Sequence, residues 1–68
     1  MTFGERLKLK RREQLLTIRE LATKSGLTPV SITNYEHDYR KPNTISICKL
    51  AKALGTTYEE LVGENELE

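Results

Sequence analysis

Apolar residues recur along this 68-residue chain at the spacing of short amphipathic helices, and no segment alternates with the period of a β-strand. Five segments carry the helical pattern, and each is bounded by residues that favour helix ends. The predicted fold class is therefore all-α. We expect one domain over residues 1–63 and a short acidic tail at residues 64–68, which has too little apolar content to order itself.

The first segment, residues 2 to about 14, is rich in helix formers. Phe3 and Leu7 lie one turn apart, and Leu15 or Leu16 closes the apolar side of this helix. Its outer face is strongly basic.

The second helix begins at Thr17 and runs to about Ser25. Thr17 and Glu20 have the spacing of a capping box, in which each side chain accepts a hydrogen bond from the other residue's backbone N–H. Gly26 suits the left-handed position that follows a helix end.

Thr28 caps the third helix, and Pro29 occupies its first position, where no intrahelical hydrogen bond is lost. Ile32 and Tyr35 follow on the inward side. Together with the second helix, this segment has the spacing of a helix-turn-helix, an element that places one helix in the major groove of DNA.

A fourth helix follows a polar loop, with Thr44 as its predicted cap and Gly55 at its end. Its inward side follows the spacing i, i+3, i+4 and i+7: Ile47, Leu50, Ala51 and Leu54. Thr57 caps a short fifth helix, which spans Tyr58 to about Val62, with Leu61 on its inward side.

Composition argues against several function classes. The single cysteine, Cys48, rules out an internal disulfide, and no Cys/His cluster could hold a structural zinc. We therefore expect no metal, cofactor or small-molecule ligand.

No nucleophile–base–acid set points to an enzyme. No long apolar run predicts a signal peptide or membrane span, so the cytoplasm is the expected location. We expect Cys48 to be partly buried as a small hydrophobe.

Charge is distributed unevenly along the chain. Residues 1–41 carry nine basic and five acidic side chains, whereas residues 42–68 carry two basic and five acidic ones. This asymmetry suits a module with one face that binds a polyanion. Ordinary solvated charge would explain it equally well.

An ordered set of short matches runs through most of the chain: Thr17, Glu20-Leu21-Ala22, Gly26-Leu27-Thr28, Ile32, Tyr35-Glu36, Pro42, Leu50 to Gly55, and Glu60-Leu61. In this order they resemble the Cro/CI-type helix-turn-helix family, the XRE-like or lambda-repressor-like DNA-binding domains. The resemblance covers roughly residues 3–62. It implies a compact five-helix domain, usually dimeric, that binds operator DNA and regulates transcription.

The resemblance also implies which residues read DNA, because the start of the motif's second helix reaches base edges in the major groove. Asn34 is the best suited, since its amide can pair with N6 and N7 of adenine. Val30 would favour the methyl group of thymine. The expected base contacts are Pro29, Val30, Ser31, Thr33 and Asn34.

Phosphate contacts would position the domain without reading sequence. Helix N-termini favour anions, and the loop after the third helix is basic. The expected phosphate contacts are Thr17, Arg19, Thr28, His37, Tyr39, Arg40, Lys41 and Thr44.

Three further positions gain meaning from the resemblance. In the family, an arginine at the place of Arg11 typically forms a largely buried ion pair with a glutamate at the place of Glu36, so we expect a structural tie here rather than a phosphate contact. Ile18 stands where the family usually has glutamine. Asp38 stands where glycine is frequent, so an aspartate must carry a left-handed backbone conformation there.

The function expected from these residues is that of a sequence-specific DNA-binding transcriptional regulator, a repressor that binds a palindromic operator as a homodimer. One alternative is an antitoxin or protein-interaction module. Another is the DNA-binding part of a longer regulator. The residues expected to form the dimer contact are Ile45, Tyr58, Leu61 and Val62.

Overall fold

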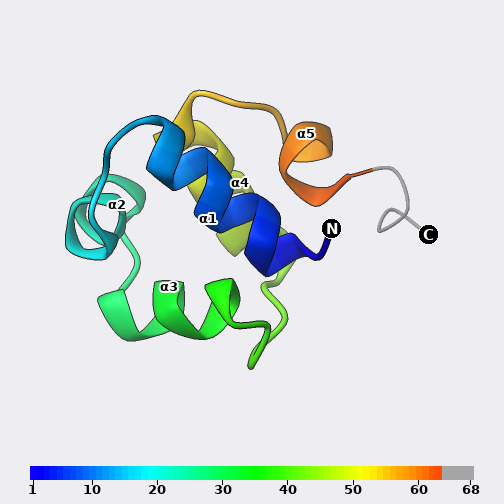
Figure 1. Ribbon diagram of the computed structural model, residues 1–68, viewed down its shortest axis with the longest axis horizontal. Helices are drawn as coiled ribbons and strands as arrows, with labels where there is room; N and C mark the ends of the chain where they lie inside the picture. Colours follow the sequence, from blue (N-terminus) through cyan, green and yellow to red (C-terminus); the bar gives the residue numbers. More distant parts are fainter. Residues whose placement is uncertain (64–68) are drawn as a thin grey trace.

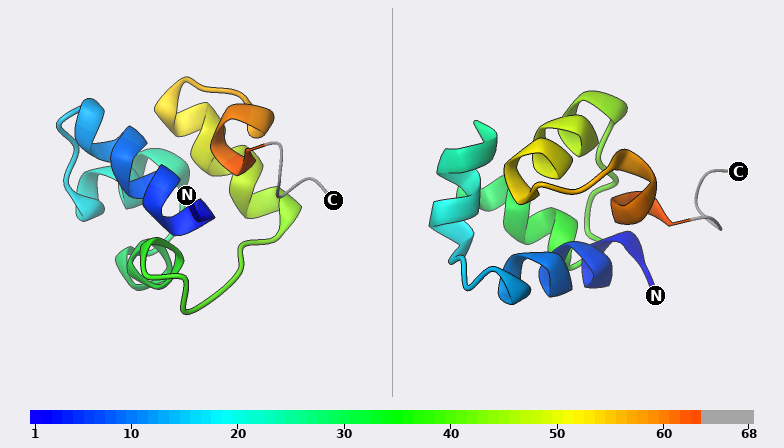
Figure 2. Two further views of the ribbon diagram at one scale, coloured as in Figure 1. Left: turned by 45° about the vertical axis from the view of Figure 1, so that its right-hand side comes forward. Right: turned by 90° about the horizontal axis from the view of Figure 1, so that it is seen from above.

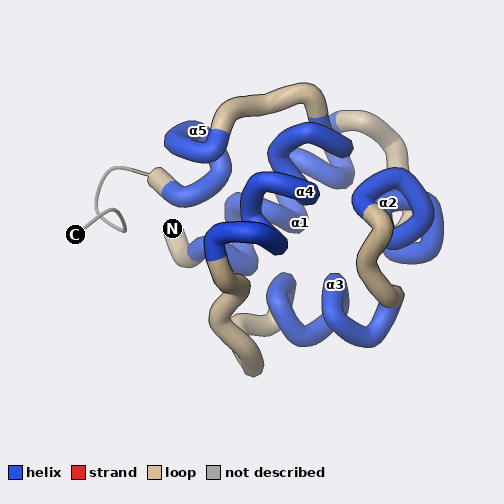
Figure 3. The backbone as a smooth tube through the Cα atoms, turned by 180° about the vertical axis from the view of Figure 1, so that it is seen from behind, coloured by secondary structure: helices blue, strands red, loops and turns tan. Residues whose placement is uncertain are grey.

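The computed structural model describes residues 1–63, which form five helices and no strand (Figure 3). The all-α prediction is confirmed, and the predicted acidic tail lies outside the described residues. The helices are α1 (Phe3–Glu13), α2 (Ile18–Ser25), α3 (Pro29–Glu36), α4 (Thr44–Leu54) and α5 (Tyr58–Val62).

The helices enclose one core between two layers. α1 lies in front of α4 in the view of Figure 1, and the two helices are seen in opposite layers from above (Figure 2, right). α2 contacts both α3 and α4, while α3 also contacts α1. On the other side of the core, α5 bridges α1 and α4. As a result, α3 lies at one edge of the molecule with its outer face uncovered (Figures 1 and 2).

Each helix contributes one side chain that has no exposed area. These five side chains are Leu7, Leu21, Ile32, Leu50 and Leu61. They meet because the apolar stripe of each short helix faces the same centre. The chain has no disulfide to support it, so this shared core is what holds the five helices together.

Every helix begins at a polar side chain that accepts a hydrogen bond from a backbone N–H three residues later. The predicted caps Thr17, Thr28 and Thr57 are confirmed. The predicted cap Thr44 is wrong, because Asn43 caps α4 and its side-chain oxygen accepts from Ser46 N at 2.8 Å. Asparagine and threonine both cap well, so the sequence pattern alone does not choose between these neighbours.

The helix ends are of two kinds. Gly26 ends α2 in the predicted left-handed conformation, with φ 73°, which glycine adopts without steric cost. α1 and α3 are instead followed by non-glycine residues in that conformation, Leu15 at φ 57° and Asp38 at φ 58°. The left-handed backbone expected for Asp38 is therefore present.

The structure decides one open choice and corrects two further expectations. Leu16 rather than Leu15 packs against the core. Cys48 is exposed, contrary to the expected partial burial, because it follows the inward residue Ile47 and faces away from the core. Leu61 and Val62 are core residues, so their predicted place in a dimer contact is corrected: their side chains are already covered by the rest of this chain.

Candidate nucleic-acid interface

The orientation of α3 is fixed by its inward side. Ile32 is fully buried, and Tyr35 is buried with its hydroxyl donating to Ser46 Oγ of α4 at 3.3 Å. The opposite side of the helix is consequently turned outward. Pro29 is exposed there, and Val30 leaves 68% of its surface in solvent. A valine so exposed in a small domain makes no contribution to the core.

The first turn of α3 is locally well ordered. Thr28 Oγ1 accepts from the N–H of Ser31 at 3.1 Å and donates its own hydrogen to Ser31 Oγ at 3.0 Å. The Ser31 hydroxyl keeps its hydrogen for a further acceptor. Thr33 and Asn34 are half-buried, and the Asn34 side-chain amide has no hydrogen-bond partner within residues 1–63. The outward side of α3 therefore presents small side chains with unused hydrogen-bonding capacity.

The start of α2 carries the predicted capping box in full. Thr17 Oγ1 accepts from Glu20 N at 3.0 Å, and Glu20 Oε1 accepts from Thr17 N at 2.8 Å. The hydrogen bond from the Thr17 backbone to the Glu20 carboxyl, and after it that from the Thr17 side chain, lower the pKa of this carboxyl below its ordinary value. Ile18 packs against the core in the place where the family usually has glutamine, so its side chain serves folding.

The loop between α3 and α4 has a defined shape. The rings of His37 and Tyr39 stack with their centroids 5.3 Å apart and their planes 18° apart. Tyr39 is 78% exposed, and Arg40 and Lys41 beside it are exposed as well. This loop continues from α3 along the same edge of the molecule (Figure 1). The edge thus combines the outward side of α3 with two cations and two stacked rings.

All the residues expected to contact phosphate are exposed. They are Thr17, Arg19, Thr28, His37, Tyr39, Arg40, Lys41 and Thr44. They come from the first turns of α2, α3 and α4 and from the loop, so the fold leaves each of them accessible to a ligand.

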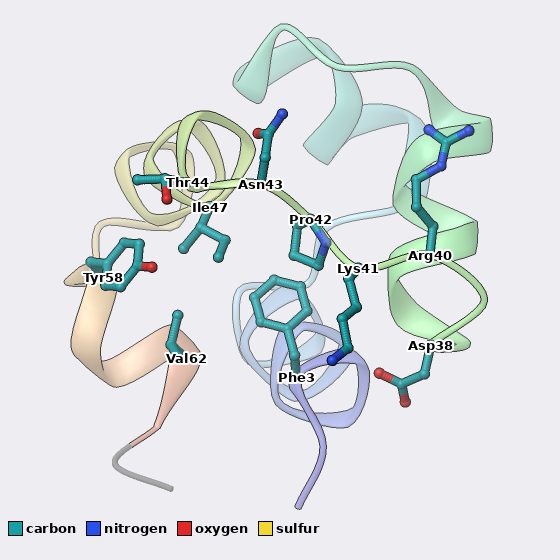
Figure 4. Close-up of a pocket in the computed structure, with 10 residues that line it drawn as sticks. All are labelled: Phe3, Asp38, Arg40, Lys41, Pro42, Asn43, Thr44, Ile47, Tyr58 and Val62. Carbon is teal, nitrogen blue, oxygen red and sulfur yellow. The ribbon is translucent and has the colours of Figure 1, made fainter. Parts of the chain in front are cut away.

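A groove of about 680 Å³ lies between this loop, α5 and the start of α1 (Figure 4). Phe3, Ile47 and Val62 give it apolar walls, and Pro42 and Tyr58 also line it. Arg40 and Lys41 line its rim and extend in opposite directions from the loop (Figure 4). Arg40 and Lys41, which are expected to contact phosphate, therefore line the same groove as Tyr58, which is expected to contact a second subunit.

The predicted tie between Arg11 and Glu36 is present and buried. The Arg11 guanidinium donates to both Glu36 oxygens, from Nε at 2.6 Å and from Nη2 at 3.1 Å. Its Nη1 donates to the carbonyl oxygen of Leu16 at 2.7 Å. The hydrogen bonds to Glu36 raise the pKa of Arg11 above its usual range, so burial does not remove the charge of the guanidinium. Neither side chain is available to DNA.

A second tie, which the sequence pattern does not reveal, joins Asp38 to the start of α1. Asp38 accepts from the Thr2 hydroxyl at 2.7 Å and from the Gly4 N–H at 3.0 Å. Gly4 lies so close to α3 that a Cβ atom there would be 2.5 Å from the carbonyl oxygens of Tyr35 and Glu36. Thr2 and Glu5 form a capping box that we did not predict, although its threonine-to-glutamate spacing could have revealed it.

These observations define a small helix-turn-helix domain in which the outward side of α3 and the adjoining loop form the candidate interface. A family model described as helix-turn-helix matches residues 7–61. The chain belongs to this family, whose Cro/CI-like members are DNA-binding regulators of transcription rather than enzymes.

The curated relatives are regulators of transcription. The chain is similar to the transcriptional regulator ImmR of Bacillus subtilis, with 34% identity over 98% of this chain and 53% of ImmR. It is 42% identical to the transcriptional repressor RghR of the same species, over 90% of this chain and 46% of RghR. An immunity repressor of Bacillus phage phi105 is 36% identical, over 98% of this chain and 46% of that protein. The chain spans about half the length of these relatives.

Two solved structures have the same fold. The restriction-modification controller protein C.AhdI from Aeromonas hydrophila aligns with a TM-score of 0.85 and 36% identity, over 87% of this chain and 89% of that one. The P22 c2 repressor, solved in complex with a synthetic operator, aligns with a TM-score of 0.86 and 26% identity, over 91% of this chain and 94% of that one. Within residues 1–63, no helix is long and apolar enough to cross a membrane.

Proposed function

We propose that this chain binds double-stranded DNA in a sequence-specific way, with α3 in the major groove, and represses transcription from a palindromic operator as a homodimer. One observation carries the proposal: the core holds α3 by Ile32 and Tyr35, which leaves its first turn exposed beside a basic loop. The repressor relatives support the regulatory role. A DNA partner of this kind implies a cytoplasmic location in a bacterium.

Selection of binding sites from random DNA tests the proposal most directly. We expect enrichment of an inverted repeat whose half-sites lie about one helical turn apart. Absence of any enriched sequence would favour a protein-interaction module over a sequence-specific regulator. The protein used is the 68-residue chain itself, and the selection is repeated at two salt concentrations.

Base reading is assigned chiefly to Asn34, with Pro29, Val30, Ser31 and Thr33 around it. Replacing Asn34 by alanine should reduce the preference for the selected site over scrambled DNA by about 1–3 kcal/mol and leave binding to scrambled DNA unchanged. The matched control is Arg40→Ala, which should weaken binding to both DNAs alike. An N34A variant with an unaltered preference would refute the assignment.

Backbone contacts are assigned to the exposed residues of the three helix starts and the loop. If a dimer neutralises about six phosphates, the logarithm of the binding constant should fall with the logarithm of salt concentration with a slope near −5. A slope near zero would exclude this mode of binding.

The dimer contact is assigned to Ile45 and Tyr58. Ile45 lies in the first turn of α4 and is 67% exposed. Tyr58, the first residue of α5, is half-buried and lines the groove. Ile45→Glu should convert a dimer on DNA into a monomer and weaken binding to the inverted repeat more than binding to a single half-site. The experiment is sedimentation with each DNA. Equal loss on both DNAs would contradict the assignment.

A further inference from the structure

We propose that Asp38 is a positioning residue for DNA binding: its carboxylate anchors the loop between α3 and α4 to the start of α1 and so holds Tyr39, Arg40 and Lys41 in place to contact the DNA backbone. This inference rests on the proposed function, because it concerns how the same surface is held in shape. Nothing in the sequence pattern pointed to it.

The first part of the argument is the pair of hydrogen bonds. Asp38 Oδ2 accepts from the Thr2 hydroxyl at 2.7 Å, and Oδ1 accepts from the Gly4 N–H at 3.0 Å. Both donors belong to the first turn of α1, where backbone N–H groups have no partner within the helix. Thr2 is itself the cap of α1, since its hydroxyl oxygen accepts from Glu5 N at 3.1 Å. A residue more than thirty positions away along the chain thus completes the end of α1.

The second part is the close approach that makes these bonds possible. At Gly4, a Cβ atom would lie 2.5 Å from the carbonyl oxygens of Tyr35 and Glu36 and 2.8 Å from Asp38 Oδ1. Only glycine therefore lets the first turn of α1 rest directly on the last turn of α3. Gly4 is buried, so the exposed Asp38 carboxylate is anchored to a part of α1 that is itself packed against α3.

The third part is the backbone of the loop. Asp38 has φ 58°, while the N–H of Asp38 donates to Tyr35 O at 3.1 Å and the N–H of Tyr39 donates to Asn34 O at 2.9 Å. This is the Schellman arrangement, which turns the chain sharply after a helix. The Asp38 side chain reaches α1, whereas the exposed rings of His37 and Tyr39 stack on one another. Arg40 and Lys41 follow directly from this turn.

The negative charge of Asp38 and its positioning role lead to opposite expectations for DNA affinity when the residue is replaced. An acid in a loop that faces phosphates repels them, so loss of its charge alone should strengthen DNA binding. Loss of a positioning residue should weaken binding, because the adjacent cations would no longer be held in one arrangement. The sign of the effect therefore separates the two roles.

The test compares Asp38→Asn with Asp38→Gly. Both variants lose the same charge, and both residues tolerate the left-handed conformation. Asparagine keeps a side-chain oxygen that can accept from Gly4 N–H, whereas glycine keeps none. Binding is measured by fluorescence anisotropy on a short mixed-sequence DNA duplex over a range of salt concentrations. Circular dichroism first establishes the temperature at which each variant is folded.

We expect D38G to bind the duplex about fivefold more weakly than D38N, the effect of one hydrogen bond, and with a shallower salt dependence. Equal affinities, or tighter binding by D38G, would overturn the proposal. Glu13→Gln is the charge control, because it removes an exposed acid at the other end of α1. This control should bind no more weakly than the wild type.

A double-mutant cycle supplies a measurement that mere destabilisation would not alter. In a chain carrying Tyr39→Ala, Arg40→Ala and Lys41→Ala, the further change D38G should no longer reduce affinity, because the groups that Asp38 positions are gone. An undiminished effect in that background would overturn the proposal. Failure of the proposed function has a different signature: the wild type itself would show no salt-dependent binding.

Discussion

The turns that follow α1 and α3 share one backbone geometry and differ in what supports it. The N–H of Leu16 donates to Arg11 O at 3.2 Å, just as the N–H of Tyr39 donates to Asn34 O at 2.9 Å. Both turns place a non-glycine residue at positive φ. Leu15 is 89% exposed, whereas the Asp38 side chain is bonded to α1. The same strained conformation is thus left uncompensated in one turn and used to fix a loop in the other.

Arg11 connects these two turns. Its guanidinium donates to the carbonyl oxygen of Leu16, in the first turn, and to the carboxylate of Glu36, the last residue of α3. The two ends therefore share one buried support. Changes to this support should affect both turns, while changes at Leu15 or Asp38 should affect one.

The largest expected effect comes from breaking the shared support. Arg11→Met or Glu36→Gln should lower the free energy of unfolding by about 3–5 kcal/mol, because each leaves a buried partner without its counterpart. Urea denaturation followed by circular dichroism measures this loss.

The control for that prediction is the double variant Arg11→Met with Glu36→Gln. Since it leaves no buried charge unpaired, it should be more stable than either single variant. A double variant whose loss equals the sum of the two single losses would show that the ion pair is not the source of the effect.

Gly4→Ala should have the next largest effect, and it concerns the α3 turn alone. The added methyl group would collide with two backbone oxygens that cannot move independently of α3, at a cost of about 2–3 kcal/mol. Gly55→Ala is the matched control, because a Cβ atom there meets nothing within 4 Å and only its positive φ is unfavourable. Thermal unfolding of both variants checks the prediction. A G4A variant no less stable than G55A would contradict the close approach.

Glycine substitutions at the two left-handed positions should change the stability of the protein in opposite directions. Leu15→Gly should raise stability by about 0.5–1 kcal/mol, since it relieves the unfavourable φ and removes a side chain that buries little surface. Asp38→Gly relieves the same φ but also loses two hydrogen bonds, so it should lower stability by about 1 kcal/mol. Chemical denaturation measures both. If both variants were stabilised, or both destabilised, the two turns would not differ in how they are supported.

The smallest expected effect is at the helix starts, where α1 and α2 carry the same capping box. Backbone hydrogen bonds from Thr2 and Thr17 lower the pKa values of Glu5 and Glu20 below 4.5. Their contribution to stability is therefore complete above pH 4.5 and is lost as the pH falls through the lowered values. Glu20→Gln should flatten this part of the stability–pH curve. Unchanged acid sensitivity in E20Q would contradict the capping role.

The sequence predicted the helices well because their ends are determined locally. Thr17, Gly26 and Pro29 each act on neighbouring backbone groups, so spacing alone reveals them. The Asp38 anchor could not be found this way, because its donors Thr2 and Gly4 are distant along the chain. The sequence alone also does not distinguish an anchoring aspartate from other polar loop residues.

The features of the candidate site likewise differ in whether local sequence reveals them. The Arg11–Glu36 pair was predicted only through the family resemblance, because nothing local to either residue indicates the other. Leu61 was predicted to face inward and is buried, but the burial of Val62 was missed, since a five-residue helix can turn its apolar side either to the core or to a partner. Only the assembled fold decides which.

The bond from Arg6 Nη1 to the carbonyl oxygen of Val62, at 2.8 Å, joins residues 56 positions apart. α1 packs on α3 and α5, and both of these helices follow it in the chain. During synthesis α1 is made first and must wait for these partners, whereas α2, α3 and α4 can begin to associate with one another sooner. Such distant contacts also give the domain a higher contact order than a simple helical hairpin, so we expect docking of α1 to be a late step in its folding.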